Sequence, residues 1–444
     1  MVPRPVNPAA NGPSLTITPR LWEDLVAHHF PGDRDEHGSV IFAEHVNGPR
    51  GSRLLARRLV PAVDDIDYVP AEHGYRALTA TFVRDNILTA RANNYIYLAV
   101  HNHRGRDHVG FSSDDTASHE RGYPALSQIS GTTVGGLVIT LNAAAGDLWF
   151  ADGTRTALAE LVIPGNNLRR LRPRVAPSPV NVDDTYDRQA RLFGDRGQST
   201  LALMTVAIVG LGGIGSILVE LLARLGVGDL VLIDNETVDV TNLPRLVAAE
   251  RDDVDKPKTE IAARNARRAN PDITLTLHQA RVERPAVLDD LQQSDWIFLA
   301  ADTDSARHWV NATVQRHLIP GTQTGVKVPV AKDGTIGRIH AVTRILTPGD
   351  GCLWCNNLID PTELAIEMQP DHERAHARYV DQIPAPSVIA LNSIAAAEAV
   401  NHFMLAVTNL HTHDRDAADV LHLPRDRNRA LQNHRRDPNC HWCH

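Results

Sequence analysis

The sequence predicts an α/β protein of two or three domains, on three observations. The chain has 444 residues, and one domain typically takes roughly 150. Beyond residue 204, short apolar runs alternate with segments of helical periodicity, which indicates a doubly wound parallel sheet with helices on both faces. The composition, 43% hydrophobic and 22% charged, is that of globular domains with large cores.

Charge and hydropathy exclude several classes of protein. The formal net charge of −8 argues against a general nucleic-acid or membrane-surface binder. No apolar run approaches 18 residues, so no transmembrane helix is expected. The first 14 residues, MVPRPVNPAANGPS, lack the apolar stretch of a secretory signal, and we expect a cytoplasmic protein.

The first part of the chain mixes helices and strands. Residues 1–14 are rich in Pro, Asn and Gly, and we expect them to be disordered. Thr18 and Pro19 suit the N-cap and first position of a helix. A further helix is expected over about 82–93. Apolar runs predict strands at 39–43, 95–100, 134–140 and 147–151.

The second part begins after a change in composition. Residues 169–184 are basic, then rich in Pro and Ser, then acidic, and they predict a linker between a domain at 15–168 and one at 185–444. After it, strands are expected at 205–209, 229–234 and 296–300, and a long helix after the glycines that follow residue 209.

One group of metal-ligating residues follows the strand expected at 95–100. Side chains at i and i+2 of a strand point the same way, so His101 and His103 can share one Zn²⁺. Asp115 is the candidate third ligand, and Ser112 is placed to donate to a developing oxyanion. Zinc lowers the pKa of its bound water, and Glu36 is the candidate general base.

This HxH followed by SxxD, over about residues 15–168, resembles the JAB/MPN (JAMM) metalloprotease family. The resemblance implies a JAMM-type α/β fold with zinc on His101, His103 and Asp115, Ser112 as oxyanion donor and Glu36 as base. It implies cleavage of peptide or isopeptide bonds after the C-terminal glycine of ubiquitin-like proteins. Three positions depart from the common pattern or leave an alternative: Arg104 replaces a proline, Asp114 rivals Asp115, and Glu44 rivals Glu36.

A glycine-rich loop follows the strand expected at 205–209. Gly210, Gly212 and Gly215 let the backbone approach phosphates at the start of a helix. Asp234 ends the next strand, where it can bind a ribose hydroxyl. Alone this pattern is typical of dinucleotide binding, but polar and cationic residues surround it. They suit a triphosphate with Mg²⁺ better than a hydride carrier.

These surroundings resemble the ThiF/MoeB/E1 adenylating family over about residues 186–443. The motifs are YDRQARLFG at 186–194, DVTNLPR at 239–245, DKPKTE at 255–260 and ADTDSARHWVN at 301–311. The resemblance implies a Rossmann-like domain that binds ATP.

The roles that this resemblance implies fall on matching positions. Asn242, Arg245 and Lys258, rather than Lys256, contact the phosphates, and Asp302 binds Mg²⁺. Arg188 acts as an arginine finger in the partner subunit's site, which implies a homodimer. Leu246 stands where the family often has Gln.

The four cysteines form two CxxC pairs, Cys352/Cys355 and Cys440/Cys443, which predict a structural tetrathiolate zinc in a cytoplasmic protein. His441 and His444 are alternative ligands. With all four thiols on zinc, none is left to take a carrier as a thioester. We expect the chain to stop at the acyl-adenylate and pass it to another molecule, such as an E2-like protein or a sulfur donor.

Together the motifs predict a bifunctional enzyme with ATP, Mg²⁺ and two zinc ions, one catalytic and one structural. It would adenylate the C-terminal glycine of a ubiquitin-like or sulfur-carrier protein, and its zinc (iso)peptidase half would mature or deconjugate that carrier. One alternative is activation of a ThiS/MoaD-like carrier for cofactor or cysteine biosynthesis, as opposed to ubiquitin-like conjugation. Another is a non-catalytic scaffold that binds such carriers.

Overall fold

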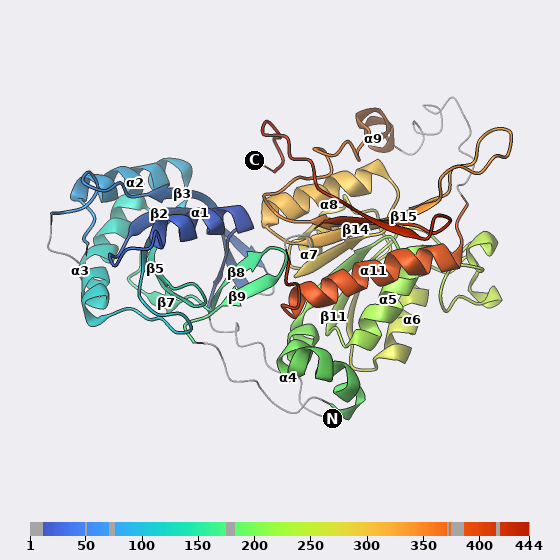
Figure 1. Cartoon of the computed structure of the whole chain (residues 1–444), viewed down its shortest axis with the longest axis horizontal. Helices are drawn as coiled ribbons and strands as arrows, with labels where there is room; N and C mark the ends of the chain where they lie inside the picture. The colour runs from blue at the N-terminus through green and yellow to red at the C-terminus, as the bar shows by residue number, and fades with distance from the viewer. Residues whose placement is uncertain are drawn as a thin grey trace. The chain divides into compact units, whose positions relative to one another are not determined.

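The structure, a computed structural model, describes residues 12–48, 51–70, 76–174, 183–370, 373, 386–413 and 418–443. These residues form two compact units, each with its own sheet (Figure 1). The N-terminal unit takes its described residues from 12–164 and 168–174. The C-terminal unit takes them from 165–167 and 183–443.

The N-terminal unit is built on a nine-stranded sheet in the order β7-β6-β5-β4-β2-β3-β1-β8-β9. Its strands are β1 (Ser14–Thr16), β2 (Gly38–Gly48), β3 (Gly51–Pro61), β4 (Ile96–Asn102), β5 (Val134–Ile139), β6 (Ala144–Trp149), β7 (Arg155–Ala157), β8 (Glu160–Pro164) and β9 (Leu168–Leu171). Strand β4 pairs antiparallel with β2 and parallel with β5. The register sets Gly38 opposite His101, so the loop before β2 and the end of β4 meet at one edge.

Helices cover both faces of this sheet. Ile41 packs in the same cluster as Trp22 and Leu25 of α1 (Pro19–His29). Its neighbours Val40 and Phe42 point to the other face and pack with residues of α2 (Ala80–Asn93) and α3 (Ser113–Ser130). This alternation follows from the period of two along a strand.

Most elements expected in this unit are confirmed, with two differences at its ends. Thr18 is the N-cap of α1, and Pro19 is its first residue. Residues 1–11 of the expected disordered segment lie outside the described residues, but Ser14 already belongs to β1, paired with β3 and β8. The first residues of the expected linker 169–184 form β9, paired with β8, while residues 175–182 lie outside the description.

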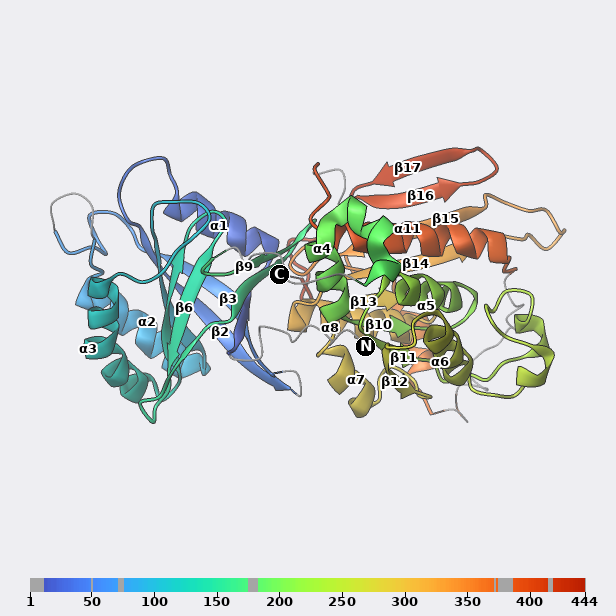
Figure 2. The same ribbon diagram turned by 90° about the horizontal axis from the view of Figure 1, so that it is seen from below.

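The C-terminal unit has an eight-stranded sheet in the order β12-β11-β10-β13-β14-β15-β16-β17. Its strands are β10 (Thr205–Val209), β11 (Asp229–Ile233), β12 (Thr274–His278), β13 (Trp296–Leu299), β14 (Gly321–Lys327), β15 (His340–Leu346), β16 (Asp419–Leu423) and β17 (Asn428–Gln432). Strands β10 to β14 pair in parallel, as the sequence predicts. Strands β15 to β17 extend the sheet in antiparallel fashion, which was not expected (Figure 2).

The strand order places a topological switch point between β10 and β13. From β10 the chain continues to β11 and β12 on one side and later to β13 and β14 on the other. Ligands of open α/β sheets bind at the carboxyl ends of the strands at such a point. The helices of this unit are α4 (Asp187–Leu203), α5 (Gly213–Leu225), α6 (Lys258–Ala269), α7 (Pro285–Leu291), α8 (Asp304–His317), α9 (Pro361–Glu367) and α11 (Ile389–Val407).

Helix α11 is the one described helix that is long and apolar enough to cross a membrane by length and composition alone. The helices of protein cores meet the same criterion, and α11 contacts α5, β14 and β15 (Figure 1). Its buried residues, such as Phe403, pack against Trp296 and Phe298 of β13.

Candidate functional site

The glycine loop lies at the switch point, between β10 and α5. Gly210 has φ of +92°, and a Cβ there would lie 2.6 Å from the amide nitrogen of Ala301, at the end of β13. A Cβ at Gly215 would lie 1.9 Å from the Gly210 carbonyl oxygen, so both positions require glycine. Gly212 is the N-cap of α5, which no described side chain caps. The start of α5 therefore offers backbone N–H groups and the positive end of the helix dipole to an anion.

Asp234 is fixed against this loop. It follows β11, and its Oδ2 accepts a hydrogen bond from the backbone N–H of Leu211 at 2.6 Å. Its Oδ1 accepts another from the N–H of Glu236 at 2.8 Å. Burial raises the pKa of this carboxyl, while the Leu211 N–H and the nearby charge of Lys258 oppose that rise. Asp234 therefore lies between the glycine loop and Lys258.

The two lysines of the DKPKTE motif point to different places. The backbone of Lys258 pairs with Glu236, because its N–H donates to the Glu236 carbonyl at 3.1 Å. The Lys258 ammonium is buried and forms an ion pair with the Glu236 carboxylate. Lys256 is about half exposed, and its ammonium lies 3.0 Å from Asp253. The structure thus brings Lys258, and not Lys256, to Asp234.

Arg245 and Asp302 approach the glycine loop from two other segments. The Cδ of Arg245 lies 3.3 Å from the position of a Cβ on Gly213, at the start of α5, and its guanidinium donates to the Thr241 carbonyl at 2.6 Å. Asp302 is exposed and directly follows Ala301, whose backbone contacts Gly210.

Asn242 lies in the short turn that leads to Arg245. Its Oδ1 accepts a hydrogen bond from the N–H of Asp239 at 3.2 Å, within a capping box that closes the turn. The backbone N–H of Arg245 in turn donates to the Asn242 carbonyl at 2.9 Å.

Arg188 lies away from the glycine loop of its own chain. The next residue, Gln189, donates from Nε2 to the carbonyl of Leu225 at 2.9 Å, at the C-terminal end of α5. Helix α5 has 13 residues. At a rise of 1.5 Å per residue, its two ends lie about 20 Å apart. Arg188 is exposed at the end of α5 that lies far from Gly212.

In the N-terminal unit, His101, His103 and Asp115 come together. The ligand atoms of the three residues lie within 4.8 Å of one another. Each histidine Nε2 lies 3.4 Å from Oδ2 of Asp115, and the two Nε2 atoms lie 3.2 Å apart. Asp115 is buried, whereas about a fifth of each histidine side chain is exposed. Two imidazoles and one carboxylate are a donor set that suits zinc and leaves a fourth position for water.

The charges of this cluster stabilise one another. Burial raises the pKa of the Asp115 carboxyl, but hydrogen bonds from His101, His103 and Ser112 outweigh burial and hold that pKa well below its usual range. The bond to Asp115 raises the pKa of His103, as does the charge of Glu36. The carboxylate form of Asp115 is therefore the stable one.

Only one of the two candidate glutamates lies near the cluster. Oε1 of Glu36 lies 3.9 Å from Nε2 of His103. Glu44 lies six residues beyond Gly38 along β2, or about 20 Å from the level of His101, and its carboxylate binds Arg57 at 2.8 Å. Of the two candidate aspartates, Asp114 is exposed and only Asp115 belongs to the cluster.

Ser112 is the N-cap of α3. Its Oγ donates to Oδ2 of Asp115 at 2.7 Å and accepts the Asp115 N–H at 3.1 Å, in a capping box. The cap presents Asp115 at the start of α3, where the helix dipole favours negative charge.

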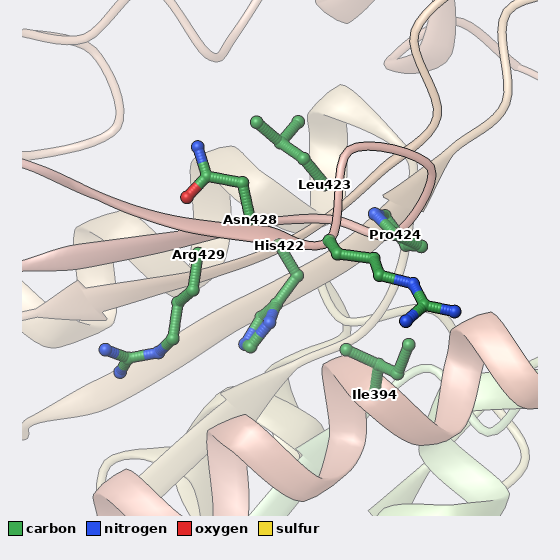
Figure 3. A pocket seen from close by; sticks show the side chains of 7 residues that line it. Ile394, His422, Leu423, Pro424, Asn428 and Arg429 are labelled. Atoms are coloured by element: carbon green, nitrogen blue, oxygen red, sulfur yellow. The ribbon is translucent and has the colours of Figure 1, made fainter.

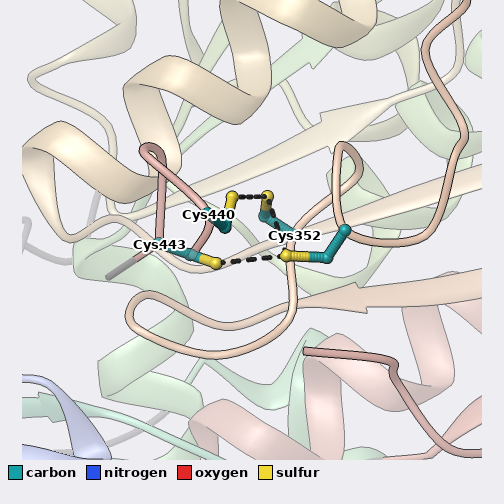
Figure 4. A group of neighbouring side chains, drawn as sticks. Cys352, Cys440 and Cys443 are labelled. Carbon is teal, nitrogen blue, oxygen red and sulfur yellow. Dashed lines mark hydrogen bonds between the residues drawn. The ribbon is translucent and has the colours of Figure 1, made fainter. Parts of the chain in front are cut away.

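The four cysteines form one buried cluster in the C-terminal unit (Figure 4). The Sγ–Sγ distances are 3.8 Å for Cys352 and Cys355, 3.6 Å for Cys352 and Cys440, and 3.4 Å for Cys355 and Cys443. A disulfide would need about 2.05 Å, whereas sulfurs around a tetrahedral zinc lie about 3.8 Å apart.

The electrostatics of Cys355 suit a thiolate. Burial raises the pKa of its thiol, but the N–H of Asp437, which donates to its Sγ at 3.4 Å, and the neighbouring thiols bring that pKa down to about 7. Burial raises the pKa of the Cys352 thiol to about 11 and also raises that of Cys443, so the four thiols differ. The sulfur–sulfur distances are what fit a tetrathiolate zinc. His441 lies outside the cluster, and His444 lies outside the described residues.

Two cavities in the C-terminal unit contain none of the residues predicted from the sequence. One, of about 190 Å³, lies between Ile394 of α11 and the β16–β17 turn (Figure 3). The other, of about 720 Å³, lies between α11 and β15 to β17. Glu398 of α11 binds Arg429 at 2.8 Å and lies 2.9 Å from Nε2 of His422, so its carboxylate already has partners within the unit.

Two residues that matter to these sites were missed by the sequence reasoning. Glu236, the ion-pair partner of Lys258, lies two residues after Asp234. Asn102 lies between His101 and His103, and its Oδ1 accepts the backbone N–H of His37 at 2.7 Å. The position of Asn102 inside the HxH motif was a signal that could have singled it out.

The chain is similar to several curated proteins over less than half of its length. The chain is 32% identical over 174 residues to the SAMP-activating enzyme E1 of Haloferax volcanii, covering 39% of this chain and 61% of that protein. It is 36% identical over 129 residues to the Sulfur carrier protein ThiS adenylyltransferase of Escherichia coli, covering 29% and 51%. It is also 36% identical over 137 residues to the Molybdopterin-synthase adenylyltransferase of Salmonella typhimurium, covering 30% and 55%.

The matched stretch spans about half to three-fifths of the length of these curated relatives. The match to the family as a whole is longer than any of these pairwise matches. It takes in residues 186–441, from the start of α4 to the second pair of cysteines, and so includes the whole glycine loop and its surroundings. The chain belongs to the ThiF family.

Proposed function

We propose that the chain adenylates the C-terminal glycine of a ubiquitin-like or sulfur-carrier protein with ATP and also cleaves bonds at that glycine with a zinc-dependent (iso)peptidase. The adenylation half rests on one observation above all. The glycine loop packs directly against the backbone that carries Asp302, with Asp234, Arg245 and Lys258 around it.

In the adenylation step, the carboxylate of the carrier attacks the α-phosphate of ATP. A bond forms between the carboxylate oxygen and phosphorus, and the bond to the bridging oxygen breaks, so that pyrophosphate leaves. The start of α5 and Arg245 face the phosphates, and Asp234 binds the ribose. Lys258 exchanges Glu236 for a phosphate oxygen. Asp302 would hold Mg²⁺, which neutralises charge on the phosphates.

The position of Arg188 supports a homodimer as part of this proposal. The arginine is exposed at the end of α5 that lies far from its own glycine loop. An arginine finger therefore has to act on the site of a second copy of the chain, where its charge would stabilise the leaving pyrophosphate.

The peptidase half rests on the cluster of His101, His103 and Asp115 with Glu36 beside it. These three residues would hold a zinc ion, which activates water and polarises a carbonyl. Glu36 takes the proton of the attacking water and returns it to the leaving amine. Ser112 donates to Asp115 in the structure, and it would turn its hydroxyl toward the substrate carbonyl to act as oxyanion donor.

Two outcomes of the adenylation remain within the proposal. The names of the relatives cover both activation of a modifier and activation of a sulfur carrier. Because the four cysteines of the chain form one buried cluster, the acyl-adenylate passes to a thiol on another molecule, an E2-like protein or a sulfur donor. A covalent carrier–enzyme thioester on this chain, released by dithiothreitol, would contradict this.

ATP–pyrophosphate exchange tests the adenylation. Carriers of the ThiS type and of the ubiquitin-like type serve as substrates. We expect exchange with at least one of them, and a loss of about 100-fold or more in Arg245→Ala and Asp302→Ala. Lys256→Ala, which removes the exposed lysine, is the matched control and keeps its activity. If neither carrier supports exchange, the adenylation proposal is wrong, and the alternative of a non-catalytic scaffold that binds such carriers is favoured.

Elemental analysis tests the two metal sites together. We expect about two zinc ions per chain, and about one in the His101→Ala/His103→Ala double variant. About one zinc in both proteins, with no uptake of added zinc, would overturn the peptidase half and leave the adenylation proposal unaffected.

A further inference from the structure

We propose that Asn102 and Arg104 are positioning residues that hold Glu36 at the histidine cluster, and that His29 orients Asn102. This inference rests on the proposed peptidase. It concerns the loop 33–37, which carries Glu36 and leads into β2. A general base has to be held within hydrogen-bond reach of the attacking water, and such a loop has no regular backbone ladder to hold it.

Asn102 joins the loop of Glu36 to the segment that carries the two histidine ligands. It lies between His101 and His103 on β4, and successive side chains alternate, so its side chain points to the opposite face of the sheet from theirs. There its buried Oδ1 accepts the backbone N–H of His37 at 2.7 Å. His37 directly follows Glu36, so the Asn102 side chain ties the loop to the end of β4, which carries His101 and is followed directly by His103.

His29 fixes the orientation of the Asn102 amide. This histidine is fully buried in α1, and burial, with the charge of His28, lowers its pKa to about 3, so its ring is neutral. Its Nδ1 lies 3.4 Å from Oδ1 of Asn102, and its Nε2 lies 2.7 Å from Oγ of Ser39. The Asn102 atom that accepts the His37 N–H must be its oxygen, and an oxygen can only accept from His29. Nδ1 of His29 therefore carries the ring proton, and Nε2 of His29 accepts the Ser39 hydroxyl.

Arg104 holds the same loop from the exposed side. Its Nη2 donates to the carbonyl of Arg34 at 2.6 Å, two residues before Glu36. Arg104 is the residue that departs from the pattern of the peptidase family, in which a proline is common at this position. A proline has no side-chain donor for the Arg34 carbonyl, so this substitution gives the loop a second attachment.

The loop also has contacts within itself: Nε2 of His37 lies 3.0 Å from Oδ1 of Asp33, and the N–H of Asp35 donates to the same oxygen at 3.1 Å. These bonds shape the loop but do not join it to the zinc ligands. Its remaining contacts lie beyond Glu36, at the start of β2. The N–H of Gly38 donates to the hydroxyl of Tyr68 at 2.8 Å, and the carbonyl of Gly38 lies 2.8 Å from Nε2 of His28. These contacts fix where β2 begins. Asn102 and Arg104 bracket Glu36 on its two sides and join it to the strand and turn that carry the zinc ligands.

Hydrogen exchange on the full-length, zinc-loaded protein measures the loop directly. In Asn102→Ala and Arg104→Ala we expect the amides of 33–37 to exchange about 10-fold faster or more, with the zinc content unchanged. Arg91→Ala, an exposed arginine of α2, is the matched control. Arg104 is exposed, so its variant keeps the fold even if the buried Asn102→Ala does not. Unchanged exchange in both variants would overturn the inference.

Catalysis separates positioning from mere stability. The probe is a peptide that ends in Gly-Gly joined to an aminocoumarin. We expect kcat to fall about 10- to 100-fold in both variants while KM stays within about 2-fold, because the base is displaced and the binding groove is not. Asn102→Asp keeps an oxygen acceptor for the His37 N–H, so we expect it to recover most of the lost kcat.

Two outcomes separate this inference from the proposed function. If Glu36→Gln cleaves the probe as the wild type does, the proposed peptidase is wrong. If Glu36→Gln is inactive while Asn102→Ala and Arg104→Ala retain the wild-type kcat, the proposed peptidase stands and the positioning role is wrong. A loss of zinc in the two variants would also contradict it, since the two residues would then support the ligands and not the base.

Discussion

The two clusters that suit a metal differ in how they are enclosed. The four cysteines are all buried, and their sulfurs lie about as far apart as sulfurs do around a tetrahedral zinc. Within the part of the chain that the structure describes, the other cluster has three donors, His101, His103 and Asp115, with both histidines partly exposed. The carboxylate of Glu36 lies 3.9 Å from Nε2 of His103. A closed set of four donors is typical of structural zinc, and an open set of three is typical of catalytic zinc.

The clusters also differ in what they hold in place. The cysteine segment is fastened to α8, because the N–H of Leu353 donates to Asn311 at 2.9 Å and the N–H of Asp360 donates to Asp304 at 3.0 Å. The histidine cluster joins the end of β4 to the start of α3, and about a fifth of each histidine side chain stays exposed. Both clusters bring their donor atoms close together, so donor count and surroundings are what distinguish the proposed structural site from the proposed catalytic one.

The largest expected effect is that of Cys355→Ser on stability. Losing a structural metal is among the few changes that destabilise a domain by more than about 4 kcal/mol. The partly exposed His101→Ala serves as the comparison, and we expect it to cost less than about 1 kcal/mol. Hydrogen exchange of the slowest amides of α8 and of β4, each compared with wild type, measures the two units separately. If the two variants lost equal free energies of unfolding, the closed and open clusters would not differ in their contribution to stability.

The next effect is that of Glu36→Gln on cleavage. A general base contributes about 10²- to 10⁴-fold, so we expect a loss of at least about 100-fold with both zinc ions retained. Glu44→Gln is the matched control, because it removes only a surface ion pair with Arg57, worth about 0–1 kcal/mol. Cleavage of the Gly-Gly aminocoumarin peptide measures both variants. If Glu44→Gln were the inactive variant, the base would be misassigned.

A third prediction concerns pH and the buried His29. Its folded pKa of about 3 lies below the usual value of 6.5, because of burial and the charges of His28, His37 and His101. The unfolded chain therefore takes up the proton first, so stability is full above about pH 6.5 and falls as the pH drops toward 3. Between pH 7 and pH 5 the loss is about 2 kcal/mol.

Hydrogen exchange of the slowest amides of β2 and β4 at pH 7 and pH 5 measures this loss. In His29→Gln, which has no titrating ring, we expect about 2 kcal/mol less pH dependence than in wild type. The C-terminal unit supplies an internal reference, because its slowest amides in β10 and β13 should respond alike in both proteins. An equal pH dependence of the N-terminal unit in both proteins would show that other groups carry it.

Local patterns predicted the parts of the molecule that depend on short stretches of chain. The strands at 205–209, 229–234 and 296–300 are buried in a parallel sheet, so their apolar runs are unbroken and easy to recognise. The HxH spacing and the two CxxC pairs each carry their geometry in a few residues, and the structure brings both sets together.

Long-range pairing accounts for what the patterns missed. Strand β17 is an edge strand with mostly exposed residues, so it has no apolar run to mark it. The choice between Glu36 and Glu44 depends on the register that sets Gly38 opposite His101, which joins residues 63 positions apart. The role of Asn102 depends on a hydrogen bond to a backbone N–H 65 residues away. The spacing of residues within a motif reveals neither this strand register nor this hydrogen bond.

The smallest effect is expected for Glu367 at the end of α9. Its buried Oε2 accepts the N–H of Ser305 at 2.7 Å, in the first turn of α8, just after Asp302. Helix α9 follows the first cysteine pair, so the closed cluster also supports the start of the helix beside the glycine loop. The N–H of Ser305 has no acceptor within the helix, and this carboxylate accepts it. The helix dipole also favours a negative charge at this end of α8.

We expect Glu367→Ala to cost about 1 kcal/mol, seen as a rise of about 5-fold in KM for MgATP with little change in kcat, because Asp302 loses its support. Glu367→Gln keeps the acceptor and should lie near wild type. Asp289→Ala, an exposed acid on α7, is the control for charge. ATP–pyrophosphate exchange at varied MgATP measures all three. An unchanged KM in Glu367→Ala would mean that the segment after the first cysteine pair contributes to stability alone. A raised KM would mean that this segment also supports the binding of MgATP at the glycine loop.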